Sequence, residues 1–183
     1  MEKSVLLEHS EALARIRRGD LDAFACLVQH FQAPIVNYLY RLTGDGEVAR
    51  DLAQDTFVQA YKKLTTSCPA LSFKAWLFRI ATNNALQYLR RKARIAFVPL
   101  DENRKTATAE EAAQKGAAAA AVQEALLRVP ERMRVCMVLH FVDGFKHREI
   151  ANMLGVSEDA VRMRIARGSE EFRRAYRASG GEL

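Results

Sequence analysis

The chain has 183 residues, of which 49% are hydrophobic and 27% charged, and it carries a formal net charge of +6. This composition excludes a fully disordered chain, and the length suits one or two domains. The excess of Lys and Arg favours an anionic partner, most often nucleic acid. The small numbers of Pro and Gly argue against a loop-rich β architecture.

The cysteines and the N-terminus indicate a soluble protein of the cytoplasm. Cys26, Cys68 and Cys136 are scattered and odd in number, so a disulfide framework is not expected. Cys136 and His140 stand four apart on an expected helix, but no second ligand pair accompanies them. We therefore interpret both as packed core residues and expect no metal and no cofactor. No apolar run approaches the about 18–20 residues of a membrane span, and no signal core is present.

Helical periodicity predicts an all-α protein whose first unit covers residues 1–94. The first of its four helices ends at Gly19, and Asp20 is a good N-cap for the second. Pro34 interrupts that second helix, and residues 44–46 form a turn before the third. The fourth helix is expected over residues 73–94.

The sequence predicts a linker over residues 95–120, because this segment is first polar and aperiodic and then rich in Ala. Alanine favours helix, so part of this segment can be helical. Residues 121–183 predict a second, smaller helical unit, with Pro130 between its first two helices. Since such a linker does little to fix the orientation of two units, we expect them to be mobile relative to each other in the free protein.

The most specific local pattern begins at residue 147 and matches a helix-turn-helix. Ala151 is small where two helices cross, Gly155 suits a turn with positive φ, and Val161 packs back on the first helix. Ser157 is the natural N-cap of the second helix, which in this motif enters the major groove. The basic residues of that helix suited to guanine edges or phosphates are Arg162, Arg164 and Arg167.

The predicted fourth helix carries six basic residues and no acidic one. Arg79, Asn83 and Arg90 fall on one face of this helix, within about 40° of each other. Trp76 and Gln87 lie at the edge of the same face. Cations, amides and a ring together suit single-stranded DNA. Taken alone, the pattern favours a simpler interpretation, in which Trp76 belongs to the core and the basic end is only a solvated helix terminus.

An acidic stripe precedes this helix. Asp51, Gln54 and Asp55 recur on one side of the predicted third helix, near apolar candidates. Taken alone, such a cluster is most simply a solvated face.

Read in order, these segments resemble a sigma factor of the sigma-70 family, of the extracytoplasmic-function type. The stretches Asp51-Leu-Ala-Gln-Asp-Thr-Phe-Val-Gln-Ala-Tyr and Phe73-Lys-Ala-Trp-Leu-Phe-Arg-Ile-Ala-Thr-Asn-Asn-Ala look like its region 2. Residues 126–174 look like its region 4. The resemblance implies a non-enzymatic protein that binds core RNA polymerase, through the β′ clamp and the β flap, and directs it to promoter DNA. It also implies an anti-sigma factor as a partner, and no small-molecule substrate.

The resemblance assigns roles to three groups of residues. The segment that binds the polymerase clamp corresponds to Asp51, Gln54, Asp55, Phe57 and Tyr61. The surface that melts and reads the −10 element corresponds to Lys74, Trp76, Arg79, Asn83, Gln87, Arg90 and Arg91. The surface that reads the −35 duplex corresponds to Arg148, Ser157, Glu158, Arg162, Arg164 and Arg167. The linker acids, which would suit a path through the polymerase cleft, are Asp101, Glu102, Glu110 and Glu111.

Two departures from the family pattern bear on promoter choice. The loop over residues 65–70 is specific to this chain, so the base captured at the −10 element does not follow from it. Gly168 and Ser169 stand where the family usually continues with Ala-Arg, which predicts the loss of one phosphate contact in the recognition helix. Glycine also costs about 1 kcal/mol in a helix interior.

Other classes explain less of the chain. A conventional helix-turn-helix regulator would usually dimerise on two half-sites and would leave the segments at residues 51–61 and 73–94 unexplained. A protein-binding helical adaptor would leave the arginine pattern unexplained. An all-α enzyme lacks candidate residues, since we find no paired catalytic carboxylates with a histidine and no Gly-rich phosphate loop.

Overall fold

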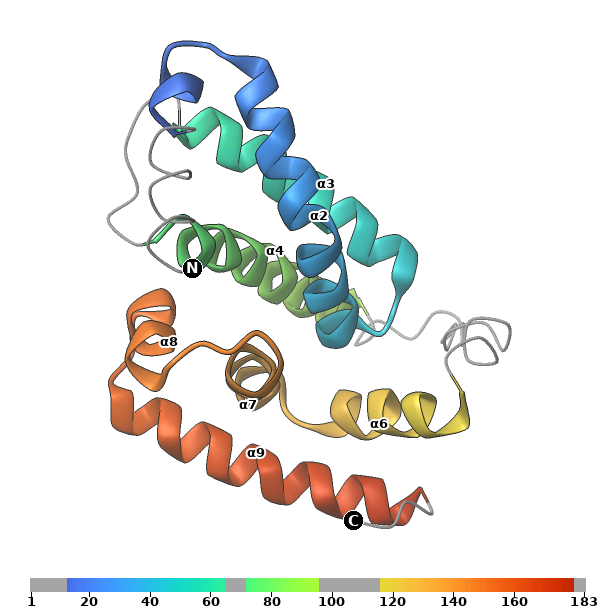
Figure 1. Ribbon diagram of the computed structural model, residues 1–183. Coiled ribbons are helices and arrows are strands. Elements are labelled where there is room, and N and C mark those ends of the chain that lie inside the picture. The colour runs from blue at the N-terminus through green and yellow to red at the C-terminus, as the bar shows by residue number, and fades with distance from the viewer. Residues whose placement is uncertain (1–12, 65–71, 96–115, 180–183) are drawn as a thin grey trace.

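The computed structural model describes residues 13–64, 72–95 and 116–179, and every regular element in these ranges is helical. The predicted all-α class is thereby confirmed. Figure 1 shows two layers: a three-helix bundle above and a second helical unit, which ends in the long helix α9, below it. None of the described helices is long and apolar enough to cross a membrane.

The bundle consists of α2 (Leu21–Thr43), α3 (Gly46–Leu64) and α4 (Phe73–Ile95). Asp20 caps α2 as expected, since its carboxylate accepts from the Ala23 amide at 3.0 Å. The Asp20 carboxyl pKa is lowered by this hydrogen bond and by a second one from Arg15. The helix runs on through Pro34, which is exposed, and ends at Gly44 with a positive φ of 73°.

Buried polar pairs fix how the bundle helices face each other. The Tyr38 hydroxyl and the Thr82 hydroxyl are 2.7 Å apart and join α2 to α4. Asn84 joins α3 to α4, because its amide donates to Thr56 at 3.1 Å and its oxygen accepts from Gln59 at 3.0 Å. A buried polar side chain is tolerated only when it is paired, so these bonds specify one rotational setting of α4.

The second unit contains α6 (Ala117–Arg128), α7 (Glu131–Met137), a π-helical turn η1 (Val138–Val142), α8 (His147–Leu154) and α9 (Glu158–Ala178). Helix α6 begins inside the segment predicted as linker. The turn signals behave as expected: Gly155 has a φ of 65°, and Ser157 caps α9 through the Ala160 amide at 3.2 Å. The π turn was not predicted.

Gly168 has a packing role that the sequence did not reveal. It is buried where α9 crosses α7, and an added Cβ would lie 2.6 Å from Met137 Sδ and 3.1 Å from Met133 Cβ. A glycine here lets the two helices approach closely. Gly168 stands at the family's Ala position, so the phosphate contact expected to be lost at Ser169 stays a prediction.

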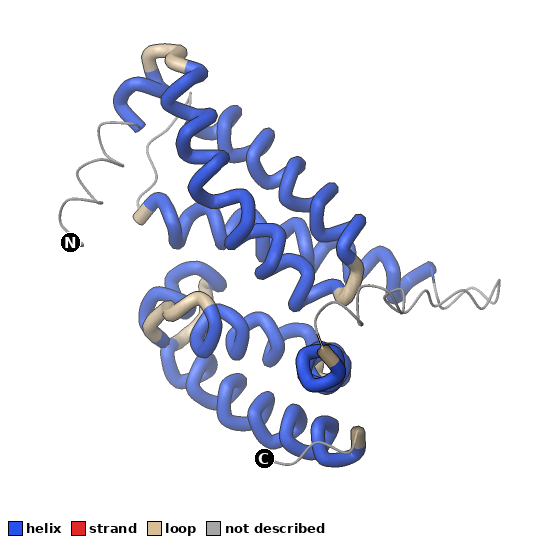
Figure 2. Tube along the Cα trace, turned by 45° about the vertical axis from the view of Figure 1, so that its right-hand side comes forward, coloured by secondary structure: helices blue, strands red, loops and turns tan. Residues whose placement is uncertain are grey.

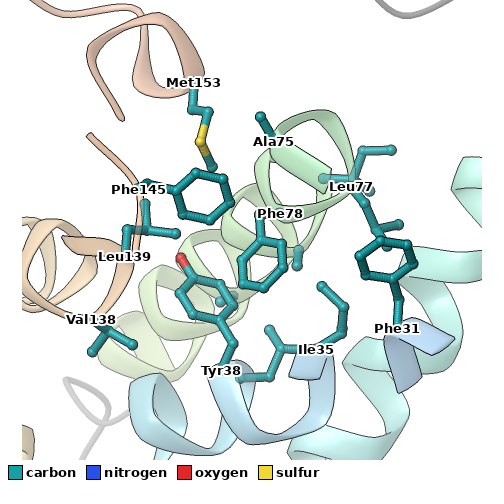
Figure 3. Packing of buried hydrophobic residues seen from close by; sticks show 14 of the residues in the cluster. Phe31, Ile35, Tyr38, Ala75, Leu77, Phe78, Val138, Leu139, Phe145 and Met153 are labelled. Atoms are coloured by element: carbon teal, nitrogen blue, oxygen red, sulfur yellow. The ribbon is translucent and has the colours of Figure 1, made fainter. Parts of the chain in front are cut away.

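The two units pack directly on each other in the structure, and our expectation that they are mobile in the free protein stays a prediction. Helix α4 contacts α8, and α2 contacts α6 and α7. Figure 2 shows the same two layers from a second direction, and Figure 3 shows Phe145, Leu139 and Met153 meeting Phe78 and Tyr38. The physical reason is apolar surface on α4 and α8 that neither unit buries alone. The linker composition gave no sign of it.

Candidate functional site

The predicted polymerase-binding stripe lies along α3. Asp51, Gln54 and Asp55 are exposed there, so their side chains are available to a partner. Phe57 is buried in the bundle instead, and Tyr61 is half-buried against Phe24, with ring centroids 5.0 Å apart. The stripe is therefore acidic and polar outside, with its aromatic members turned toward α2.

An apolar groove runs beside this stripe, between α2 and α3. It encloses about 610 Å³. Val58 is 46% exposed and Leu21 is 63% exposed at this groove, which is unusual for large apolar side chains. Arg50 and Lys62 add cations to the same lining. We missed these four residues in the sequence, although helical spacing along α3 places Arg50, Val58 and Lys62 on the flank of the acidic stripe.

Most residues predicted to read the −10 element share the outward side of α4. Arg79, Asn83, Gln87 and Arg90 are all exposed. Trp76 is half-buried and packs on Phe73, with ring centroids 5.9 Å apart, so it keeps one side available. The face therefore combines cations, amides and part of a ring, as the sequence predicted.

Two predicted members lie away from that face. Arg91 is exposed but sits about 80° around the helix from Asn83, and Lys74 sits about 180° around it. The Lys74 ammonium donates to the Asp143 carbonyl oxygen at 2.8 Å and lies 4.7 Å from the centre of the Phe145 ring. Lys74 is thus engaged with the second unit rather than aligned with the reading face.

The predicted −35 surface lies at the start of α9, on the outer side of the molecule in Figure 1. Arg162 is exposed and pairs with Glu158 at 2.6 Å and with Asp159 at 3.2 Å. Ser157 is exposed, but its hydroxyl oxygen already accepts the capping bond. The acidic first turn therefore orients the Arg162 guanidinium, in addition to suiting the helix dipole.

The remaining arginines of this surface divide between two sides of α9. Arg167 is exposed, as is Arg148 on α8. Arg164 is half-buried beside Cys136. Burial raises the pKa of that thiol, and a hydrogen bond from Arg164 offsets only part of this rise. Met163, 51% exposed and about 40° around the helix from Arg167, belongs to the outward face and was missed. The sequence could have revealed Met163, because it stands two residues after the buried Val161 and therefore on the other side of the helix.

The structure also bears on the cysteine and histidine four residues apart. Cys136 is fully buried, and His140 Nδ1 lies 3.0 Å from the Phe145 carbonyl oxygen. Across the described ranges, no group of three or more His, Cys, Asp or Glu side chains is placed to hold a metal ion.

Comparisons with known proteins agree with this geometry. A model of sigma-70 region 2 matches residues 27–95, and a model of sigma-70 region 4 matches residues 119–171. The chain belongs to the sigma-70 family. It is 27% identical to the ECF RNA polymerase sigma factor SigW of Bacillus subtilis (strain 168) over 177 residues, which are 90% of this chain and 95% of SigW.

Two solved structures share the fold of this one. CnrH, solved in complex with the cytosolic domain of CnrY, has a TM-score of 0.68 and 27% identity, over 91% of this chain and 96% of CnrH. The sigma factor RpoE of Bartonella quintana, solved with the anti-sigma factor NepR, has a TM-score of 0.66 over 84% of this chain and 96% of RpoE. At 18% identity, RpoE supports the fold alone.

Family membership settles the class of function. This ECF sigma factor directs promoter-specific transcription initiation together with RNA polymerase, and it is not an enzyme. Its partners as a sigma factor are the polymerase and promoter DNA. The alternative of a conventional helix-turn-helix regulator is set aside, because residues 27–95 match region 2.

Proposed function

We propose that the three exposed faces divide the work of a sigma factor among them. The acidic stripe of α3 and the groove beside it bind the polymerase clamp, the outward face of α4 reads the −10 element, and α9 reads the −35 duplex. The observation that carries this proposal is the groove: large apolar side chains, Leu21 and Val58, stay exposed next to Asp51 and Asp55. Apolar surface rimmed by charge is typical of a protein interface.

The clamp surface is well suited to a helical partner with mixed charge. Asp51 and Asp55 offer carboxylates to cations of the partner, and Arg50 and Lys62 offer cations to its acids. The groove between α2 and α3 binds the partner's apolar side chains. Burial of Phe57 makes it a support of this surface rather than a direct contact.

The two nucleic-acid faces differ as their targets differ. On α4, Asn83 and Gln87 can read the edges of separated bases, Arg79 and Arg90 hold phosphates, and the accessible side of Trp76 offers a stacking platform. On α9, the Arg162 guanidinium suits a guanine edge in the major groove. Met163 adds an apolar contact suited to a thymine methyl.

Two further partners belong to this proposal. Phe141 and Val142 are 62% and 50% exposed on η1, and we assign this patch to the β flap of the polymerase. We also infer an inhibitory protein partner, an anti-sigma factor, because the similar protein CnrH was solved in complex with the cytosolic domain of CnrY. As a partner of the polymerase, the protein acts in the cytoplasm.

The test combines polymerase binding with run-off transcription. Asp51→Ala with Asp55→Ala should weaken binding of core RNA polymerase about tenfold or more, since two exposed carboxylates of the interface are lost. Transcript starts obtained with the wild type on pooled genomic fragments should share two spaced upstream elements, and the double variant should reduce all of them equally.

The matched control removes two exposed acids elsewhere, Glu124→Ala with Glu170→Ala, and should keep full polymerase affinity. If the Asp51 and Asp55 variant formed holoenzyme as well as the wild type does, the acidic stripe would be only a solvated face and not a polymerase-binding surface. Starts without shared elements would contradict the assignment of α4 and α9.

A further inference from the structure

Helix α9 is longer than the reading of a duplex requires. Its 21 residues span about 31 Å at a rise of about 1.5 Å per residue. The major groove of B-form DNA is about 12 Å wide, so about eight helical residues are enough to cross it. The predicted −35 surface on α9 ends at Arg167. The C-terminal half of the helix, residues 169–178, therefore lies outside that surface.

Packing keeps this C-terminal half ordered. Helix α9 contacts α6 as well as α7 and α8. Phe172 and Tyr176 are half-buried on its inner side, with ring centroids 5.8 Å apart and ring planes 9° apart. At the end of the helix, the Ser179 hydroxyl donates to the Ala175 carbonyl oxygen at 3.0 Å. The half is thus a structured extension of the helix, and its outer side is presented at a fixed angle.

The outer side of this half is basic. Arg173 and Arg177 are exposed and lie about one helical turn apart. At about 100° per residue, they stand about 20° and 60° around the axis from Arg162. In Figures 1 and 2, α9 is the outermost helix of the second unit, so its side away from α6, α7 and α8 is uncovered. The two arginines therefore continue the face on which Arg162 lies.

Neither of these arginines is neutralised by the protein itself. Arg162 and Arg174 each pair with acids of α9. In the part of the chain that the structure describes, no carboxylate lies within ion-pair distance of Arg173 or Arg177, and this includes the exposed Glu170 on the same side. The helix dipole favours a cation in the last turn, which accounts for Arg177 but not for Arg173.

We propose that Arg173 and Arg177 make a second contact of α9 with promoter DNA, in which they bind backbone phosphates beyond the −35 element. The proposal rests on the proposed reading of the −35 duplex by the start of α9. Arginine suits this contact, because its guanidinium binds a phosphate through two hydrogen bonds. The end of a reading helix contacts the DNA backbone in the homeodomain as well. Such a contact fixes the orientation of the helix on the duplex and reads no sequence.

The spacing along α9 predicts where these phosphates lie. Arg173 and Arg177 follow Arg162 by 11 and 15 residues, which is about 16 to 23 Å along the helix axis. At about 3.4 Å for each base step, the contact lies up to about five to seven base pairs from the base that Arg162 reads. Base pairs on one side of the −35 element should therefore be contacted without any base preference.

The salt dependence of DNA binding by the holoenzyme tests this contact. The probe is a duplex with the −35 element that run-off transcription identifies and about ten further base pairs on each side, which exceeds the expected reach. Arg173→Gln with Arg177→Gln removes two charges and keeps both aliphatic stems. Each phosphate contact contributes about −0.9 to the slope of log K against log salt, so the slope should become shallower by about 1.8. The advantage of the wild type should be about twelvefold larger at 50 mM than at 200 mM salt.

Ethylation interference on the same duplex locates the contact. With the wild type, ethylation of phosphates beyond one side of the element should block binding, and the double Gln variant should lose this block alone. Arg173→Lys with Arg177→Lys keeps both charges and should keep most of the salt slope. Arg128→Gln is the matched control, because it removes an exposed arginine of α6 whose partner lies in the same helix, and it should leave the slope unchanged. All variants should match the wild type in circular dichroism.

The outcomes separate this inference from the function on which it rests. Suppose that Arg162→Ala weakens binding to the element, whereas the double Gln variant keeps the wild-type slope and interference pattern. The second contact would then not exist, and the reading of the −35 element would stand. If the holoenzyme bound the probe equally well without the element, both would fall. A double Gln variant that loses affinity for core polymerase but keeps the interference pattern would assign the two arginines to a protein partner instead.

Discussion

The α2–α4 bundle and the α6–α9 unit reach their stability in different ways. The bundle has three helices of 23, 19 and 23 residues, and buried hydrogen bonds join them across its core. The second unit has helices of 12, 7, 8 and 21 residues and a π turn. Its Phe145 and Met153 are covered partly by α4. The comparison teaches that the second unit, which has the smaller core, depends on its neighbour, whereas buried hydrogen bonds fix the bundle from within.

The largest expected effect comes from Phe78, which serves both units. Phe78→Ala should lower the free energy of unfolding by about 3–5 kcal/mol, because a fully buried ring is lost. Guanidinium unfolding should show it in two signals: the fluorescence of Trp76, which reports the bundle, and circular dichroism, which reports all helices.

Ile150 provides the contrast, since it is fully buried inside the second unit. Ile150→Val should lower the free energy of unfolding measured by circular dichroism by about 0.5–1.5 kcal/mol. The transition measured by Trp76 fluorescence should not move. If Phe78→Ala moved the Trp76 transition alone, the dependence of the second unit on α4 would be refuted.

A smaller effect is expected at the crossing of α7 and α9. Gly168→Ala places a methyl group against Met137 and Met133, which costs about 1–3 kcal/mol, and the higher helix propensity of alanine returns up to about 1 kcal/mol. We expect a net loss, measured as a lower midpoint of the circular dichroism transition.

A double-mutant cycle isolates this contact. Met137→Ala makes room at Gly168, so the two substitutions together should cost less than the sum of the separate costs. Simple additivity would mean that the methyl group is accommodated elsewhere, and that the glycine is not required by the crossing.

The smallest effect concerns pH and the interface itself. Burial raises the pKa of the Asp143 carboxyl from its ordinary 3.8 to about 6, although Arg41 of α2 and Lys74 of α4 lower it. The form in which the two units pack together thus binds the proton more strongly than a form in which they are separated. Packing of the units is favoured below about pH 4 and loses this contribution as the pH rises through about 6.

Small-angle scattering between pH 5 and 7.5 should therefore show the wild type expanding slightly as the pH rises. Asp143→Asn should remove this dependence, because an amide does not ionise. The neighbouring Tyr38, His140 and His147 are common to both proteins, so the difference isolates Asp143. Parallel curves for the two proteins would show that Asp143 does not sense the separation of the units.

Much of the fold was accessible from the sequence, because local chemistry determines it. Asp20 and Ser157 cap helices through their own side chains, and Gly44 and Gly155 adopt the positive φ that ends one. Helical spacing placed Arg79, Asn83 and Arg90 on one exposed face and Val161 in the core. These features depend on neighbours within a few residues, and the family resemblance rested on them.

The tertiary structure alone decided which side of each helix meets another unit. Lys74 and Asn83 lie on one helix and looked equally suited to DNA, yet the first contacts Asp143 and the second faces solvent. Gly168 looked like a costly glycine in a helix interior until its distance to Met137 showed a close helix crossing. Periodicity gives the direction in which a side chain points around the axis of its helix. Which element packs against that side depends on long-range packing, which no local spacing encodes.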